Sequence, residues 1–288
     1  MHASPEDPRY GLAVALNVLI VVAEAVGGFM SHSTALIADA GHNLSDVMGL
    51  VLAGGALWLS KRPAAGRRTY GFGKATVFAA LINGLVLMLV SGGLVVEAVQ
   101  RLLHPEPVQA PLVMGVAAIG VVVNTLVALM FVKTSGHDVN ARGAFLHMAG
   151  DAAVSVGVII SAGLIAWTGQ AWIDPATTIV VVAVIVVGTW GLLRESVDLA
   201  LDAAPQGADL GRIRDFLLQG PGVTDVHDLH VWAMSTTETA LTAHLVRPEG
   251  EGDDRIRAEI AEDLHARFGV GHATLQIERV RGVHCPEC

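Results

Sequence analysis

Six apolar segments, each of about 20 residues, occupy the first two thirds of this 288-residue chain. A helix of about 20 residues spans the roughly 30 Å hydrocarbon core of a bilayer. Lipid offers no hydrogen bonds to the backbone, so such segments must be helices, in which the backbone amide and carbonyl groups bond to one another. The pattern predicts an α-helical membrane domain with spans at Gly11–Met30, Ala35–Ser60, Ala75–Val99, Pro111–Val132, Gly143–Thr168 and Ile173–Leu193.

Composition supports a membrane protein and limits its partners. Hydrophobic residues make up 52% of the chain and charged residues only 16%, a balance too apolar for a soluble domain. Most of the acidic residues lie in the last third, so the net charge of -9 belongs mainly to the C-terminal part. Basic residues are scarce and scattered, which argues against a nucleic-acid partner. The first ten residues are polar, and the apolar run after them is a span rather than a secretory signal peptide.

The basic residues indicate how the chain is oriented in the membrane. They gather in the links after the second and fourth spans and just after the sixth, at Lys61, Arg62, Arg67, Arg68, Lys74, Lys133, Arg142 and Arg194. Loops rich in lysine and arginine stay on the cytoplasmic side. We therefore expect both termini in the cytoplasm and the protein in the cell membrane, which is the inner membrane in a Gram-negative organism.

The chain after Arg194 has the composition of a small soluble domain. Periodicity and stop signals predict, in order, a helix, two strands, a helix and a strand, at Asp209–Gln219, Val223–Met234, Thr239–Val246, Asp253–Phe268 and His272–Val280. This αββαβ order predicts a ferredoxin-like α+β domain with its helices on one face of a small sheet. The expected division is a short N-terminus at 1–10, a membrane domain at 11–194, a cytoplasmic domain at 195–284 and a tail at 285–288.

Two of the apolar segments contain the same pair of polar residues. His42 and Asp46 are four residues apart, as are His147 and Asp151, so each pair lies on one face of its helix. Such residues are costly in a membrane and usually bind something or pair with one another. The second and fifth helices are antiparallel in this topology, so the four side chains offer two nitrogen and two oxygen ligands. That set suits zinc better than magnesium or calcium, although pairing that only holds the helices together is the alternative.

Further polar residues lie within the spans. Asp39 shares a face with His42, and we expect it to support the metal site, to line the outer exit or simply to pair with another residue. Asn83 and Asn124 are expected to form hydrogen bonds between helices. The sequence assigns no role to Glu24.

Several of these features together resemble the cation diffusion facilitator family of metal/proton antiporters. They are the six spans, the paired His/Asp motifs, the run ALIADAGHNLSD, and the segments VHDLHVWAM and LTAHLV in the C-terminal part. The resemblance implies a homodimer that exports divalent zinc in exchange for protons, with cadmium or cobalt as further substrates. It also implies that His42, Asp46, His147 and Asp151 are the transport-site ligands.

The resemblance extends to metal binding in the C-terminal domain. It implies that His227, His244 and Glu278 bind zinc there. Gly271 occupies the position where some relatives have a histidine, and His272 follows one residue later as a weaker candidate.

The chain ends in a CxxC motif formed by Cys285 and Cys288. Thiolates are strong zinc ligands, and this pair needs partners from its own or a neighbouring subunit to complete four-coordination. The two cysteines suit a reducing compartment better than a structural disulfide. An exposed tail that binds no metal is the alternative.

Two other functions are weighed against transport. An intramembrane metalloenzyme needs a general base beside the metal, typically in an H-E-x-x-H motif, which the sequence lacks, so we expect no enzyme. A membrane-embedded metal sensor that signals through its cytoplasmic domain stays open.

Overall fold

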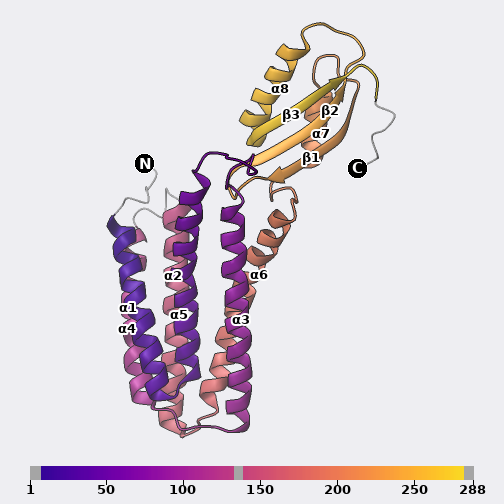
Figure 1. The fold of residues 1–288 in the computed structure, drawn as a ribbon. Coiled ribbons are helices and arrows are strands. Elements are labelled where there is room, and N and C mark those ends of the chain that lie inside the picture. The colour runs from indigo at the N-terminus through magenta and orange to yellow at the C-terminus, as the bar shows by residue number, and fades with distance from the viewer. Residues whose placement is uncertain (1–7, 133–138, 282–288) are drawn as a thin grey trace. The chain divides into compact units, whose positions relative to one another are not determined.

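The computed structural model describes residues 8–132 and 139–281. Its long helices are α1 (Pro8–Ser31), α2 (Thr34–Ser60), α3 (Ala75–Leu103), α4 (Ala110–Val132), α5 (Val139–Thr168) and α6 (Ile173–Ala200) (Figure 1). All six are long and apolar enough to cross a membrane, which confirms the predicted spans. Helix α5 begins four residues before the predicted start, and α6 continues seven residues past the predicted end.

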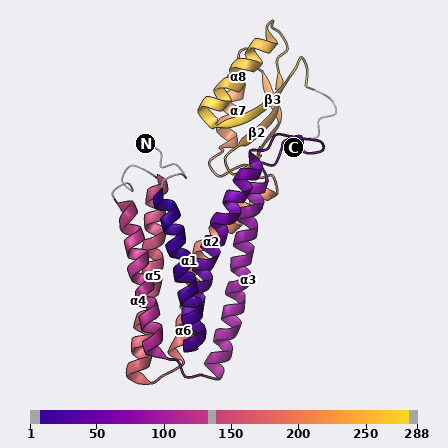
Figure 2. The same cartoon turned by 60° about the vertical axis from the view of Figure 1, so that its left-hand side comes forward.

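The chain separates into two compact units, Met1–Val51 with Ile82–Gly191, and Leu52–Leu81 with Leu192–Cys288. In the first unit, α4 and α5 run side by side (Figure 2). Small residues allow this close packing: Ala117 of α4 and Ala162 of α5 are buried in one cluster with Leu36 of α2. A Cβ atom at Gly27 of α1 would lie only 2.7 Å from a methyl carbon of Val116 of α4, so α1 also approaches α4 closely.

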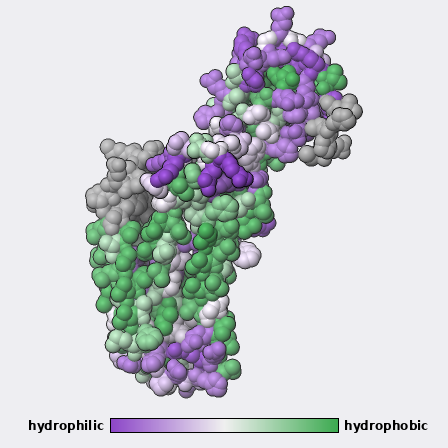
Figure 3. Space-filling view, viewed as in Figure 1, coloured by the Kyte–Doolittle hydropathy of each residue, from purple (hydrophilic) through white to green (hydrophobic). Residues whose placement is uncertain are grey.

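Large apolar side chains cover the outside of the long helices. Leucine, valine and isoleucine residues of all six helices are exposed. On the face of the molecule seen in Figure 3, residues of this kind form a hydrophobic band. A soluble protein rarely exposes a continuous apolar surface of this extent. The band therefore identifies the surface that faces lipid.

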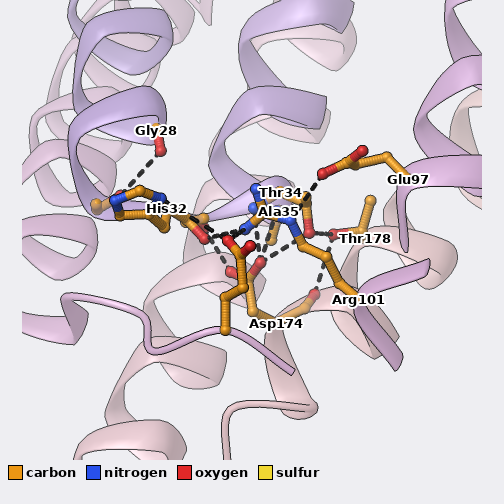
Figure 4. A network of polar contacts seen from close by, with 11 residues as sticks. Gly28, His32, Thr34, Ala35, Glu97, Arg101, Asp174 and Thr178 are labelled. Atoms are coloured by element: carbon orange, nitrogen blue, oxygen red, sulfur yellow. Dashed lines mark hydrogen bonds and ion pairs between the residues drawn. The ribbon is translucent and has the colours of Figure 1, made fainter. Parts of the chain in front are cut away.

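Asp174, the second residue of α6, joins α6 to the beginning of α2 (Figure 4). Its buried carboxylate accepts hydrogen bonds from Ser33 Oγ at 2.5 Å, Thr34 N at 2.6 Å, Thr34 Oγ1 at 2.8 Å and Ala35 N at 3.3 Å. Ser33 Oγ also accepts from Leu36 N at 3.2 Å, which is the geometry of a helix N-cap. A negative charge thus satisfies the unpaired amides at the N-terminus of α2.

Replacing Asp174 with asparagine should destabilise the protein. The amide removes the charge and turns a donor toward groups that are themselves donors. Hydrogen bonds to a charged group contribute roughly 1.5–3 kcal/mol, so we expect a loss of that order. Thermal unfolding of the protein in detergent measures the change, with Glu106→Gln, an exposed carboxylate of the α3–α4 link, as the control. Equal melting temperatures for both variants would contradict this assignment.

The C-terminal domain has the predicted αββαβ order. It consists of α7 (Leu210–Leu218), β1 (Asp225–Ala233), β2 (Thr239–Val246), α8 (Asp253–Phe268) and β3 (Val270–Glu278). Strand β2 is central, antiparallel to β1 and parallel to β3. A parallel pair needs a crossover, and α8 supplies it.

Helices α7 and α8 cover one face of this sheet, as expected (Figure 2). Leu217 of α7 and Leu264 of α8 share one core with Leu245 of β2 and Val226 of β1. Successive side chains of a strand point to opposite faces. The residues next to Leu245 and Val226 therefore lie on the uncovered face, and they include His244 and His227.

Candidate functional site

The structure brings the four predicted residues of the membrane domain together. Along α2, Nε2 of His42 lies 3.8 Å from Oδ2 of Asp46, and along α5, Nε2 of His147 lies 3.8 Å from Oδ2 of Asp151. The distances between helices are shorter. Nε2 of His42 is 3.5 Å from Oδ1 of Asp151, and Nε2 of His147 is 3.3 Å from Oδ2 of Asp46.

This crossed pairing follows from the direction of the helices. Each helix presents its histidine one turn before its aspartate, so only antiparallel helices place each histidine against the aspartate of the other. The imidazole rings then lie 6.2 Å apart and nearly perpendicular, at 76°. Both helices contribute equally, one nitrogen and one carboxylate each.

The spacing of these atoms suits a tetrahedral metal ion. Ligand atoms about 2.0–2.1 Å from a tetrahedral zinc ion lie about 3.3–3.4 Å from one another. The four distances from a histidine Nε2 to an aspartate oxygen are 3.3–3.8 Å, longer than most direct hydrogen bonds. Oδ2 of Asp151 and Nδ1 of His42 are buried and have no hydrogen-bond partner in the described part of the chain. The set is therefore better arranged around a common centre than as mutual hydrogen bonds.

The four side chains of the site are shielded from solvent to different degrees. The side chain of Asp151 is 3% exposed and that of His147 is 43% exposed. His42 and Asp46 lie between these values. Three of the candidate ligands, His42, Asp46 and Asp151, have ligand atoms within 4.8 Å of one another, and Nε2 of His147 lies near Oδ2 of Asp46. The more exposed His147 is the open side of the site.

Two further polar residues lie beside the site and were not predicted from the sequence. Asn43, the neighbour of His42, donates a hydrogen bond from Nδ2 to Glu24 Oε2 at 2.9 Å. Ser155, one turn after Asp151, donates from Oγ to Asp39 Oδ2 at 2.9 Å. Their positions one and four residues from ligands were the only sequence signal for them.

A second group of possible ligands lies on the uncovered face of the C-terminal sheet. Glu278 of β3 sits between two imidazoles, with Oε2 3.1 Å from His227 Nε2 and Oε1 3.0 Å from His244 Nδ1. The rings of His227 and His244 are 5.1 Å apart because these residues are paired across β1 and β2. These three predicted residues have ligand atoms within 4.8 Å of one another.

Asp228 is a further residue of this group that the sequence did not reveal. The pairing of β1 and β2 is interrupted between His227 and His230, and Asp228 has a φ of 51°. This irregularity places Oδ2 of Asp228 3.5 Å from His244 Nε2, and Oδ1 lies 2.9 Å from His230 Nε2. A regular strand would have directed Asp228 into the core, so its position depends on the irregularity.

The structure separates His272 from this group. His272 is exposed and pairs with Ala240, and its ring lies 5.8 Å from the ring of Tyr70. It precedes Glu278 by six residues on β3, or about 20 Å at 3.3 Å per residue. Cys285 and Cys288 lie outside the residues that the structure describes.

Comparisons with known proteins cover nearly the whole chain. The family described as "Cation efflux transmembrane domain" matches residues 11–199, and "Cation efflux protein, cytoplasmic domain" matches residues 205–280. The zinc transporter ZitB of Escherichia coli is 35% identical over 291 residues, which cover 99% of this chain and 92% of ZitB.

Two other bacterial proteins are similar to the same extent. The metal cation efflux system protein CzcD of Cupriavidus metallidurans is 34% identical over 278 residues, 96% of this chain and 88% of CzcD. The cadmium, cobalt and zinc/H(+)-K(+) antiporter of Bacillus subtilis is 34% identical over 266 residues, 90% of this chain and 84% of that protein.

Proposed function

This chain belongs to the cation efflux, or cation diffusion facilitator, family, and we propose that it exports zinc from the cytoplasm in exchange for protons. The family consists of metal transporters, so the protein is a multi-pass membrane transporter and not an enzyme. The crossed arrangement of His42, Asp46, His147 and Asp151 is the observation that carries the proposal. In it, these four residues are the ligands of the transported ion.

The donor set supports zinc as the substrate. Two imidazoles and two carboxylates in a tetrahedral set suit zinc, which has no preference for octahedral geometry. Cadmium and cobalt also bind such sites, and both are named with zinc for the Bacillus subtilis relative. Magnesium and calcium prefer shells made only of oxygen ligands.

Proton exchange follows from the chemistry of the ligands. A histidine binds metal only in its neutral form, so protons and zinc compete for His42 and His147. On the proton-rich side the histidines are protonated and zinc leaves. The empty site then returns with protons, which completes the exchange.

The proposed orientation places both termini in the cytoplasm, with a membrane domain at 11–194 and a cytoplasmic domain at 195–284. It rests on the lysine and arginine residues of the links after the second and fourth spans. Zinc would then bind from the cytoplasm and leave on the other side of the cell membrane.

We assign a regulatory role to the metal group of the C-terminal domain. His227, His244, Glu278 and Asp228 offer nitrogen and carboxylate ligands at the spacing zinc requires, and Nδ1 of His227 is buried without a hydrogen-bond partner in the described residues. The match to the family's cytoplasmic domain supports a homodimer. Zinc held there, with Cys285 and Cys288 as further ligands, would stabilise one arrangement of the two subunits.

The site also predicts how selectivity can be changed. Replacing His42 with aspartate leaves one nitrogen among four ligands, so oxygen, the harder ligand atom, then predominates. We expect weaker discrimination against Mn²⁺, which prefers oxygen ligands. Competition of Mn²⁺ with zinc for uptake measures this change, and an unchanged order of preference would show that selectivity lies elsewhere.

Zinc flux into sealed vesicles that contain the purified protein tests the proposed function. With an acidic interior, wild-type protein should accumulate zinc, and collapse of the pH gradient should stop the accumulation. A membrane sensor would bind zinc without moving it. Binding without flux would therefore overturn the transport proposal in favour of the sensor.

A further inference from the structure

Two carboxyl groups of the membrane domain take no part in the proposed zinc site. Glu24 of α1 and Asp39 of α2 have no exposed surface. Neither is within ion-pair distance of a lysine, arginine or histidine in the described part of the chain. A buried charge without a compensating partner is strongly unfavourable.

The hydrogen bonds of these two groups come from neutral donors. Asn43 Nδ2 donates to Glu24 Oε2, and Ser155 Oγ donates to Asp39 Oδ2, both at 2.9 Å. The second oxygen of each carboxyl group, Oε1 of Glu24 and Oδ1 of Asp39, is buried and has no partner among the described residues. The same holds for Oδ1 of Asn43. The cluster thus contains more acceptors than donors.

Four helices meet at this cluster. A Cβ atom at Gly120 of α4 would lie 2.9 Å from Glu24 Oε1 and 3.3 Å from Ser155 Oγ of α5. Gly120 therefore leaves room for the free oxygen of Glu24 beside the donor of Asp39. Any larger residue would displace one of these groups.

The surrounding charges do not neutralise the pair. On α2 and α5 the ionisable neighbours are the four proposed zinc ligands, and α4 (Ala110–Val132) has no ionisable residue. Glu97 and Arg101 of α3 pair with each other, and Asp174 of α6 binds the first turn of α2 (Figure 4). Like charges in a low dielectric disfavour double ionisation, so a proton on one carboxyl group supplies the missing donor.

We propose that Glu24 and Asp39 together bind one proton that is exchanged for zinc. This inference rests on the proposed zinc/proton exchange and adds a proton site beside the metal ligands. When zinc enters the metal site, its two positive charges favour the carboxylate form, and the pair releases its proton. When zinc leaves, the pair takes up a proton again, and no other bond is made or broken.

Glu24→Gln and Asp39→Asn test this proposal, because each amide keeps the size of its carboxyl group and cannot release a proton. Reconstituted protein is loaded with zinc, and the protons moved per zinc ion are counted with a pH-sensitive dye. Each variant should bind zinc in detergent yet move fewer protons per zinc and respond less to an acidic interior. Glu97→Gln, which removes a carboxylate outside the cluster, should keep the wild-type ratio.

The possible outcomes are distinct. If wild-type protein moves zinc without protons, the proposed exchange itself is wrong. If wild-type protein exchanges protons and both variants keep its ratio, only the proton site is wrong. The proposal is also overturned if either variant binds one zinc ion fewer per chain than wild-type protein, which would make the pair a metal site.

If the variants do not fold, chemical modification of wild-type protein tests the same proposal. Dicyclohexylcarbodiimide modifies protonated carboxyl groups in apolar surroundings. At neutral pH it should modify Glu24 or Asp39, as located by mass spectrometry, and zinc should protect them. Absence of modification at both residues would overturn the proposal.

Discussion

Replacing Asp151 with alanine is expected to abolish zinc export while the protein stays folded and inserted in the membrane. Asp151 is the most buried of the four proposed ligands, and its carboxylate approaches both His42, at 3.5 Å, and His147, at 3.8 Å. Its removal leaves three ligands and too little negative charge for a divalent ion. Cells that lack their own zinc exporters should then tolerate no more zinc than cells without the protein.

Asp46→Ala should have the same effect, because Asp46 has the corresponding place on α2. Glu97→Ala is the matched control, since Glu97 is a partly exposed carboxylate of a membrane helix and pairs with Arg101. Its tolerance should equal that of wild-type protein. Wild-type tolerance in both aspartate variants, at equal protein levels in the membrane, would contradict the proposed site.

His244→Ala is expected to raise the zinc concentration that activates transport and to change the maximal rate much less. His244 lies between Glu278 and Asp228 in the C-terminal domain. Loss even of an outer partner of a ligand costs roughly 10–100-fold in metal affinity, so a shift of at least about tenfold is expected. Zinc changes the equilibrium between two arrangements only by its difference in affinity for them.

Zinc titration of flux in the full-length protein measures this shift. His265→Ala is the control, because His265 lies on α8 and contacts the carbonyl oxygen of Val270 instead of the metal group. Cys285→Ser with Cys288→Ser should shift activation in the same direction. If His244→Ala or the double cysteine variant is as inactive as Asp151→Ala, the C-terminal group belongs to the transport path and its regulatory assignment is wrong.

Most of the fold follows from patterns that are local in the sequence. Strand β2 and helix α8 have the predicted bounds, because turn and stop signals enclose both of them. An apolar segment shows which residues lie in the membrane but not where their helix ends, so the predicted end of α6 at Leu193 was too early. Its polar segment after Leu193 continues as helix to Ala200, since arginine, glutamate and leucine are good helix formers.

The grouping of His42, Asp46, His147 and Asp151 could be predicted because the same pair occurs at helical spacing on two antiparallel spans. The environment of Glu24 could not, because it depends on the close approach of α4 at Gly120. Asp228 was missed for a similar reason. Its place beside His244 requires an irregularity in β1 that no nearby residue type signals.

The arrangement of His42, Asp46, His147 and Asp151 around one zinc ion is tested most directly by zinc K-edge X-ray absorption. The full-length protein would carry His227→Ala, His244→Ala, Cys285→Ser and Cys288→Ser, so that zinc remains only in the membrane site. The predicted spectrum has four nitrogen or oxygen ligands at about 2.0–2.1 Å and scattering from two imidazole rings. A six-coordinate shell, or a spectrum without imidazole scattering, would contradict the proposed site.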